Sequence, residues 1–274
     1  MKEKDFVMQE EHSKQNEAAW NQFAYDAWCY RFGYPREAAE KIKDDPALRV
    51  NSLMPYFGEL KGKKVINLLG SNGNKAVAMA LLGAEVTVVD IASENERYAK
   101  DLAREANVKI NYIVSDVLKM PEEYLNGEYD IVLMELGILH YFLDLKPLMK
   151  IVSRLLKPGG RLILQDFHPI STKLITSRGK KHKVTGDYFD SSLEEVEVAY
   201  LKFVPGMESL TEEEKSGIQK AIHRKWTLGE IVTSIAASDM YIRILDEAES
   251  AKPDDKGIPK LFTIVAYRQN FCGE

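Results

Sequence analysis

The sequence predicts an α/β protein built on a doubly wound, mostly parallel sheet. Short apolar segments alternate with helix-forming segments between residues 61 and 170. The clearest unit, residues 63–90, reads "KKVINLLGSNGNKAVAMALLGAEVTVVD": a strand, a glycine-containing loop, a helix, and a second strand that ends in an acid. After residue 225, a helix and two strand-like segments follow. Repeated strand–helix units of this kind give a parallel sheet with helices on both faces.

The composition is that of an ordinary folded protein. The chain has 274 residues, of which 45% are hydrophobic and 29% are charged, and its formal net charge is -5. This charge argues against a broad electrostatic grip on nucleic acid. Cys29 and Cys272 offer neither a metal-binding spacing nor a disulfide framework, and the charged N-terminus has no signal-peptide pattern. No segment approaches the roughly 20 apolar residues that span a bilayer. We therefore expect a cytoplasmic protein, monomeric or homodimeric, with no metal, nucleic-acid or membrane partner.

The first 60 residues read as helices. Trp20, Phe23, Ala27 and Tyr30 recur at helical spacing, which predicts one apolar helix face. Two interpretations of this face stay open: it packs on the rest of the domain, or it closes as a lid over a cofactor. Because apolar stripes usually belong to a core, packing is favoured.

Strands and helices then alternate along the chain. Strands are predicted at five apolar or β-branched segments, "KVINLL", "EVTVVD", "INYIVSD", "YDIVLME" and "RLILQDF". The intervening helices are "NKAVAMALLG", "NERYAKDLAREAN" and "LKPLMKIVSRLL", the last of which is ended by "KPGG". The helix "TLGEIVTSIAASD" and the strands "YIRILDEA" and "LFTIVAYR" complete the pattern.

Residues 171–225 interrupt this rhythm. The segment is polar and too long for a simple loop in a compact domain, so we expect a structured insertion or lid. The sequence thus predicts three parts: a helical N-terminal cap at 1–60, a core made of 61–170 and 226–274, and an insertion at 171–225 that recognises the substrate.

The loop after the first strand is the first candidate binding site. In doubly wound sheets, ligands lie beyond the carboxyl ends of the strands, at the point where the strand order reverses. Gly70 and Gly73 would let the backbone approach a ligand closely. Asp90, about 20 residues further on, can bind ribose hydroxyls. These residues predict an adenosine-containing cofactor without distinguishing a dinucleotide from S-adenosylmethionine.

Several motifs between Gly73 and Phe167 resemble those of class I S-adenosylmethionine-dependent methyltransferases. They are "VVDIA", "VSDVL", "YDIVLMELGILHYF" and, as the most specific match, "LLKPGGRLIL". The final pair of strands is similar to the family's antiparallel seventh strand. The resemblance implies a Rossmann-like, seven-stranded, mostly parallel sheet with an antiparallel last strand. It also implies a methyltransferase of the small-molecule type that uses S-adenosylmethionine.

The resemblance also implies cofactor-binding roles. Asp90 takes the ribose-binding position, and Asp116 takes the position that meets the adenine amino group, with the Val117 amide beside it. Glu135, at the edge of the fourth strand, is a candidate for holding the methionine ammonium. The full predicted set is Gly70, Ser71, Asn72, Gly73, Asp90, Ile91, Asp116, Val117 and Glu135.

The loop departs from the family pattern at three positions. Asn67 stands in place of an acid, and Leu69 and Ser71 stand in place of two glycines. An amide can still orient backbone groups as donor and acceptor, so we expect Asn67 to do this. We also expect Gly70 to take over the conformational work lost on either side of it.

Candidate residues for the acceptor follow the fourth and fifth strands. His168 is a candidate catalytic base, because an unperturbed imidazole pKa of about 6.5 suits proton transfer near neutrality. Its alternative is a structural role, capping a turn or bonding to Asp166. His140 and Tyr141 are candidate substrate contacts, although a structural hydrogen bond is the favoured interpretation of His140. Tyr188, in the insertion, would line an acceptor pocket or pack within a small sheet.

Two other functions stay open. A degenerate cofactor-binding sensor or partner subunit would account for the glycine-poor loop, and an NAD-dependent oxidoreductase would use the same strand–helix–strand unit. The sequence has no N/D/S-P-P-Y/F/W motif, no Pro-Cys nucleophile and no double-glutamate hairpin. A small-molecule acceptor is therefore favoured over nucleic acid or protein.

Overall fold

A computed structural model describes residues 3–178 and 181–269. The chain divides into two compact units. Unit 1 comprises Met1–Glu122 and Glu195–Ile222, and unit 2 comprises Glu123–Glu194 and His223–Glu274, each within the described residues. Cys272, named in the sequence analysis, lies outside the described residues.

The helices and strands follow the predicted alternation. The α-helices are α1 (Glu3–Trp20), α2 (Ala24–Phe32), α3 (Pro35–Asp44), α4 (Pro46–Arg49), α5 (Met54–Phe57), α6 (Asn74–Leu81), α7 (Ser93–Ala106), α8 (Leu145–Leu155), α9 (Glu212–Ser216) and α10 (Leu228–Ala236). The strands are β1 (Lys64–Leu68), β2 (Glu85–Asp90), β3 (Ile110–Val114), β4 (Tyr129–Glu135), β5 (Leu156–Phe167), β6 (Ile175–Arg178), β7 (Lys181–Val184), β8 (Leu193–Val196), β9 (Ala221–Arg224), β10 (Met240–Glu249) and β11 (Pro259–Arg268).

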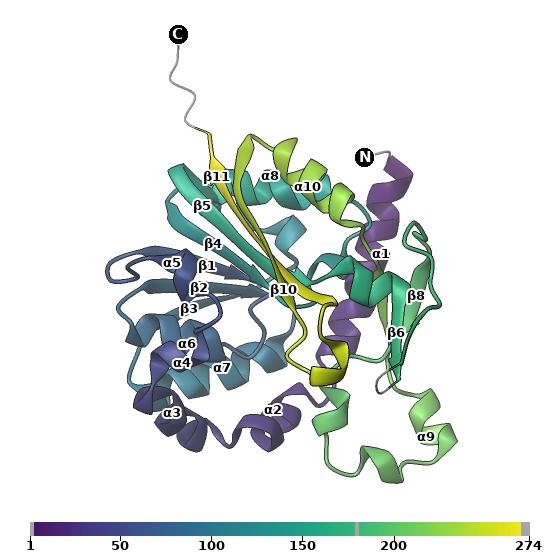
Figure 1. Ribbon diagram of the computed structural model, residues 1–274. Helices are drawn as coiled ribbons and strands as arrows, with labels where there is room; N and C mark the ends of the chain where they lie inside the picture. The colour runs from purple at the N-terminus through teal and green to yellow at the C-terminus, as the bar shows by residue number, and fades with distance from the viewer. Residues whose placement is uncertain (1–2, 179–180, 270–274) are drawn as a thin grey trace. The chain divides into compact units, whose positions relative to one another are not determined.

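Unit 1 contains three parallel strands covered by helices. β1 pairs with β2, placing Val65 beside Val86, and β2 pairs with β3, placing Val88 beside Tyr112. All four of these side chains are buried, as expected for strands covered by helices. Helix α6 packs on β2, α7 packs on β3, and α3 packs on both of these helices (Figure 1).

Unit 2 contains the other four strands of the large sheet. β4 and β5 are parallel, β11 runs antiparallel to β5, and β10 runs antiparallel to β11. Helices α8 and α10 pack against each other, α8 on β4 and β5 and α10 on β10 (Figure 1). At the start of β5, Gly160 leaves no room for a side chain, because a Cβ there would lie 2.9 Å from the Tyr129 carbonyl oxygen. This close approach explains the glycine of the "KPGG" turn.

The seven strands follow the order β10-β11-β5-β4-β1-β2-β3. Within unit 1 the three strands run parallel, and within unit 2 β11 runs antiparallel to both of its neighbours, β5 and β10. The predicted Rossmann-like sheet, seven-stranded and mostly parallel with an antiparallel last strand, is confirmed.

The N-terminal cap differs from the predicted single stripe. Helix α1 ends at Trp20, and Phe23 adopts a left-handed conformation with φ of 58° before α2 begins. Phe23 and Tyr30 are exposed, whereas Ala27 and Trp28 are buried. The helical-spacing prediction was therefore wrong for Phe23 and Tyr30, because the break between the two helices resets the periodicity.

Tyr200 joins this break to the later part of unit 1. Its ring is fully buried and lies 5.2 Å from the ring of Trp20 and 5.3 Å from that of Trp28. Its hydroxyl lies 2.9 Å from the Ala19 carbonyl oxygen and 2.5 Å from that of Gln22. The carbonyl groups left open where α1 ends are thus satisfied by a residue distant in sequence.

The predicted insertion, 171–225, is built from short elements. They include the antiparallel hairpin of β6 and β7 in unit 2, and α9 in unit 1. Residues 171–194 belong to unit 2 and residues 195–222 belong to unit 1. The division into cap, core and insertion stays a prediction.

We expect Tyr200→Phe to lower the free energy of unfolding by about 1–2 kcal/mol, because the carbonyl groups of Ala19 and Gln22 lose the one hydroxyl hydrogen that they share. Urea unfolding at pH 7 measures this change. Tyr241→Phe is the matched control, since Tyr241 is 48% exposed and stacks on Tyr267 at the sheet edge. Equal unfolding midpoints for the two variants would contradict this account of the cap.

Candidate functional site

The loop between β1 and α6 carries three residues in the left-handed region. Leu69 has a φ of 50°, Ser71 of 48° and Gly73 of 71°. The expectation that Gly70 takes over the conformational work was wrong, because its φ is not positive and the two non-glycine residues adopt the left-handed conformation themselves. Gly70 is needed for space instead: a Cβ there would lie 2.7 Å from Val88 Cγ1.

The carboxylate of Asp90 holds this loop from the end of β2. Asp90 is 8% exposed. Its Oδ2 accepts a hydrogen bond from the Ser71 amide at 2.9 Å, and its Oδ1 accepts from the Ala92 amide and from Asn95 Nδ2, both at 3.0 Å. Burial raises the pKa of Asp90, and these donors oppose the rise by stabilising the ionised form. They also use most of the roughly four acceptor sites of a carboxylate.

Polar atoms of the same loop lack partners. Ser71 Oγ and Asn74 Oδ1 are buried without a hydrogen bond in the part of the chain that the structure describes. The Asn74 amide faces Asn72, whose Oδ1 accepts from Asn74 Nδ2 at 2.6 Å. Tyr112 donates to the Ser71 carbonyl oxygen at 2.7 Å. Because unpartnered buried polar atoms are uncommon in native proteins, a polar ligand at this loop fits the residues present.

The remaining unit 1 candidates lie at the ends of neighbouring strands. The Ser115 amide donates to the Asp90 carbonyl oxygen at 2.9 Å, which brings the segment after β3 beside the end of β2. Asp116 is half-buried, and its Oδ1 accepts from the Leu118 amide at 2.9 Å. Val117 is buried. The structure thus gathers these residues with the loop and Asp90; Ile91, half-buried, directly follows Asp90.

In unit 2, Asp166 organises the segment that follows β4. Glu135 is the last residue of β4 and is half-buried. Asp166 accepts from the Gly137 amide at 2.5 Å and, less closely, from the amides of Ile138 and Leu139. Burial raises the pKa of Asp166 and the backbone donors oppose this rise. A buried acid therefore fixes the start of the turn that carries His140.

His140 stacks on His223, a residue that the sequence analysis missed. The two ring centroids are 3.6 Å apart with an interplanar angle of 28°, and the Tyr141 ring meets both edge-on. Both Nε2 atoms are buried without a hydrogen bond among the described residues. His223 ends the predicted insertion, and nothing in its spacing along the chain pointed to His140.

Both imidazoles of the pair are neutral at pH 7. Burial is the main cause, lowering the pKa of His223 to about 4 and that of His140 well below its usual value. The nearby charge of Lys225 acts in the same direction on both rings, whereas Glu194 opposes it at His223. Lys225 Nζ lies 2.8 Å from a Glu194 carboxylate oxygen, so these two charges partly offset each other.

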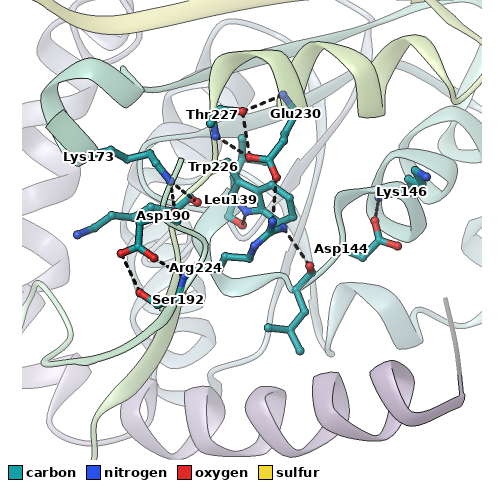
Figure 2. A network of polar contacts seen from close by, with 12 residues as sticks. Leu139, Asp144, Lys146, Lys173, Asp190, Ser192, Arg224, Trp226, Thr227 and Glu230 are labelled. Atoms are coloured by element: carbon teal, nitrogen blue, oxygen red, sulfur yellow. Dashed lines mark hydrogen bonds and ion pairs between the residues drawn. The ribbon is translucent and has the colours of Figure 1, made fainter. Parts of the chain in front are cut away.

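Arg224 and Trp226 bond to backbone carbonyls before and after His140 along the chain, and Figure 2 shows both side chains. Trp226 Nε1 donates to the Leu139 carbonyl oxygen at 2.9 Å, and Arg224 Nη1 donates to that of Leu143 at 3.1 Å. The Arg224 guanidinium lies 3.5 Å from the centre of the Trp226 ring and pairs with Glu230 at 2.8 Å. The turn after β4 is therefore fixed by side chains of a segment far along the chain.

His168, the candidate base, is buried at 2% exposure with both ring nitrogens engaged. The Ile170 amide donates to Nδ1 at 3.1 Å, so Nε2 carries the hydrogen and donates to Glu247 Oε1 at 2.7 Å. This arrangement is the turn-capping alternative. No hydrogen bond to Asp166, the other structural alternative, is among those of the described residues.

Tyr188 also has a structural partner. Its hydroxyl accepts a hydrogen bond from the Leu228 amide at 3.1 Å, in the first turn of α10, and its ring meets that of Phe189 edge-on. Lys173 is buried and donates to the carbonyl oxygens of Asp190 and Lys225, at 2.5 Å and 3.0 Å (Figure 2). The loop that carries Tyr188 is therefore tied down at two points.

The described residues hold no cluster of three or more His, Cys, Asp or Glu side chains suited to a metal ion. None of their helices combines the length and apolarity needed to cross a bilayer.

Comparisons of sequence agree with the site. Over residues 69–164 the chain matches the family described as "Methyltransferase domain". The ubiquinone biosynthesis O-methyltransferase of Xanthomonas oryzae pv. oryzae is 33% identical over 110 residues, which cover 40% of this chain and 45% of that protein. Its counterpart from Pseudomonas aeruginosa is 30% identical over 144 residues, which cover 53% and 61%. The chain spans about half the length of these curated relatives.

Solved structures share the fold. A putative S-adenosylmethionine-dependent methyltransferase from Listeria monocytogenes superposes with a TM-score of 0.63 at 21% identity, over 82% of this chain and 99% of that one. The magnesium protoporphyrin IX methyltransferase of Synechocystis PCC 6803, solved with S-adenosylhomocysteine, gives 0.54 at 15% identity, over 94% and 100%. At these identities the likeness establishes the fold alone.

The chain therefore has the class I S-adenosylmethionine-dependent methyltransferase fold, and the resemblance read from its motifs is confirmed. More particularly, the match to the methyltransferase-domain family covers residues 69–164 and begins in the loop held by Asp90.

Ser71→Gly should raise the free energy of unfolding by about 0.5–1 kcal/mol, because glycine adopts the left-handed conformation without a Cβ penalty. The change also removes a buried hydroxyl that has no partner. Ser71→Ala is the control, since it removes the hydroxyl but keeps the backbone cost. Urea unfolding of both variants measures the difference. If Ser71→Gly is no more stable than Ser71→Ala, the left-handed backbone of Ser71 is not strained.

The histidine pair should weaken unit 2 in acid. Because the pKa of His223 is near 4 when folded and 6.5 is its ordinary value, the unfolded chain binds more protons between these limits. The stability that this group contributes is full above pH 6.5 and is lost as the pH falls toward 4. His223→Phe, which keeps a stacking ring, should flatten the dependence of the urea midpoint on pH over this window.

The difference between variant and wild type is the informative quantity, because Asp90 and Asp166 have raised pKa values and act in the opposite direction. His182→Phe is the control, since His182 is exposed on the β6–β7 hairpin. A pH profile for His223→Phe that parallels wild type would refute the assignment of a neutral pair.

Proposed function

We propose that this protein is an S-adenosylmethionine-dependent methyltransferase that acts on a small-molecule acceptor. The observation that carries the proposal is the methyltransferase-domain match at 69–164, which spans the loop, Asp90 and the end of β3. Every unit 1 residue predicted for the cofactor lies inside it. The activity, the cofactor and the acceptor of the whole protein are proposals built on this partial match.

Within this proposal, the cofactor supplies an activated methyl group on a sulfonium, and the chain binds and orients it. Asp90 would accept a hydrogen bond from the ribose, and Asp116 and the Val117 amide would meet the adenine. The unpartnered Ser71 Oγ and Asn74 Oδ1 would face polar groups of the ligand. The rest of the proposed cofactor site consists of Gly70, Asn72 and Gly73 in the loop and Ile91 after Asp90. We propose that Glu135 binds the ammonium group of the cofactor's methionine part.

For the acceptor, we propose contact with the ring cluster of His140, Tyr141 and His223. Relatives are named O-methyltransferases, which makes a hydroxyl the first acceptor to test. In transfer to oxygen, the O–C bond forms as the S–C bond breaks, and the hydroxyl proton is released to water. A neutral imidazole with an unpartnered Nε2 can accept a hydrogen bond from that hydroxyl and orient it. Tyr188 stays a candidate for contact with the acceptor.

We propose a structural role for His168. Both ring nitrogens already have partners, so proton transfer would require it to give up Ile170 or Glu247. A base is not required for every methyl acceptor, because proper alignment supplies much of the rate. The chemistry of the site therefore does not depend on His168.

A degenerate cofactor-binding module is the second candidate function. The left-handed Leu69 and Ser71 and the heavily bonded Asp90 favour it, since they leave less freedom to adapt to a ligand. The two functions differ in turnover and not in binding.

Calorimetry of the full chain with S-adenosylhomocysteine and with NAD tests the proposal. We expect saturable binding of S-adenosylhomocysteine and none of NAD. Transfer of radiolabelled methyl groups from S-adenosylmethionine to a panel of small phenols and catechols, with their methyl ethers as blocked controls, then tests turnover. Binding of NAD alone would overturn the proposal, and binding without turnover on any acceptor class would favour the module.

A further inference from the structure

A chain of buried hydrogen bonds runs from the N-terminal cap to Asp90. Trp28 lies on α2 at 4% exposure, and Asn95 lies in the first turn of α7 with no exposed surface. Trp28 Nε1 donates to Asn95 Oδ1 at 2.8 Å, and Asn95 Nδ2 donates to Asp90 Oδ1 at 3.0 Å. The three side chains come from different elements, so this series of hydrogen bonds exists only in the folded protein.

Trp28 sets the donor-to-acceptor direction of these hydrogen bonds. An indole N–H can only donate, so the Asn95 oxygen must face Trp28 and the amide nitrogen must face Asp90. An ionised carboxylate can only accept, so Asp90 suits this orientation in its charged form. Protonation at Oδ1 would place two donors against each other. The indole therefore fixes the orientation of the amide, and the amide in turn favours the charged carboxylate.

The same elements are joined at a second point. Helix α7 begins after Ala92, whose side chain cannot cap a helix. Asn21, in the break between α1 and α2, supplies this cap: its Oδ1 accepts from Ser93 Oγ at 3.0 Å and from the Glu94 amide at 3.2 Å. The cap thus fixes the first turn of α7, where Asn95 lies.

We propose that Trp28 and Asn95 are positioning residues of the cofactor site, which orient Asp90 to bind the cofactor ribose. The proposal rests on the proposed function, because it gives Asp90 the ribose. It assigns the N-terminal cap a role in cofactor affinity without placing any of its side chains on the cofactor.

The surroundings of Asp90 make this orientation matter. Burial alone favours the protonated acid, and the hydrogen bonds that oppose it come from neutral donors on the loop, at Ala92 and at Asn95. Two titratable groups interact electrostatically in this region: Tyr112 on β3, on which Asp90 acts, and Glu96 on α7, which also acts on Tyr112. Burial raises the pKa of Tyr112 well above its ordinary value, so it stays neutral and adds no positive charge beside Asp90, while Glu96 pairs with Lys100 at 2.6 Å.

Trp28→Phe tests the proposal by removing the N–H while keeping an aromatic ring. Calorimetry with S-adenosylhomocysteine as the probe should show affinity weakened by about five- to tenfold at pH 7.5. The loss should grow as the pH is lowered, because the freed amide no longer holds Asp90 in its charged form. Trp20→Phe is the matched control, since Trp20 belongs to the same cap and packs on Tyr200. It should bind with wild-type affinity at every pH.

A measurement on the wild-type protein covers a variant that fails to fold. The three tryptophans of the chain give three indole N–H signals, and Trp20→Phe and Trp226→Phe assign the third to Trp28 by elimination. We expect this hydrogen to exchange slowly with solvent, and more slowly still with S-adenosylhomocysteine bound. Exchange at the rate of an exposed indole would overturn the proposal.

The outcomes distinguish the two levels of inference. If wild type binds S-adenosylhomocysteine and Trp28→Phe matches Trp20→Phe at each pH, the positioning role is wrong and the proposed function stands. If wild type does not bind the probe at all, the proposed function fails and the positioning role fails with it.

Discussion

The carboxyl group of Asp90 at the end of β2 needs hydrogen-bond donors away from water, and much of unit 1 is arranged around this requirement. Asp90 accepts hydrogen bonds from the Ser71 amide in the loop and from Asn95 in the first turn of α7. Leaving a buried acid without donors would cost more than the modest gain that each bond gives. Where Asn67 replaces the acid of the family motif, the loop is still held by a carboxylate, one strand away.

Unit 2 solves a similar problem with a different set of groups. The turn after β4 contains a short 3-10 helix, Leu139–Tyr141, and Asp166 accepts from its amides while Trp226 and Arg224 donate to its carbonyls. Side chains therefore add to the backbone hydrogen bonds that fix this turn. Within this fixed turn, His140 keeps an unpartnered ring nitrogen against His223. Polar groups left open in an otherwise satisfied region are where we place acceptor recognition.

The N-terminal cap contributes through contacts distant in sequence. Tyr200 accounts for the carbonyl groups at the end of α1, and Trp28 extends the hydrogen bonds of Asp90 to α2. Packing was the favoured interpretation of this segment, and Trp28 is indeed buried. The indole nitrogen of Trp28 links this packing to the proposed cofactor site, because it bonds to Asn95, which in turn bonds to Asp90.

The sequence by itself determined the sheet, because short β-branched runs, a "KPGG" turn and an acid after the second strand are local signals of period and turn type. It also located the loop and Asp90. Only the tertiary structure decided that Leu69 and Ser71 adopt positive φ, since neither residue favours that region and the carboxylate of Asp90, on another strand, holds the Ser71 amide. The tertiary structure also stacks His223 on His140 and gives both ring nitrogens of His168 a hydrogen-bond partner. The stacking of His223 on His140 and the bond from His168 to Glu247 join segments far apart along the chain, and no periodic pattern in the sequence indicates such pairs.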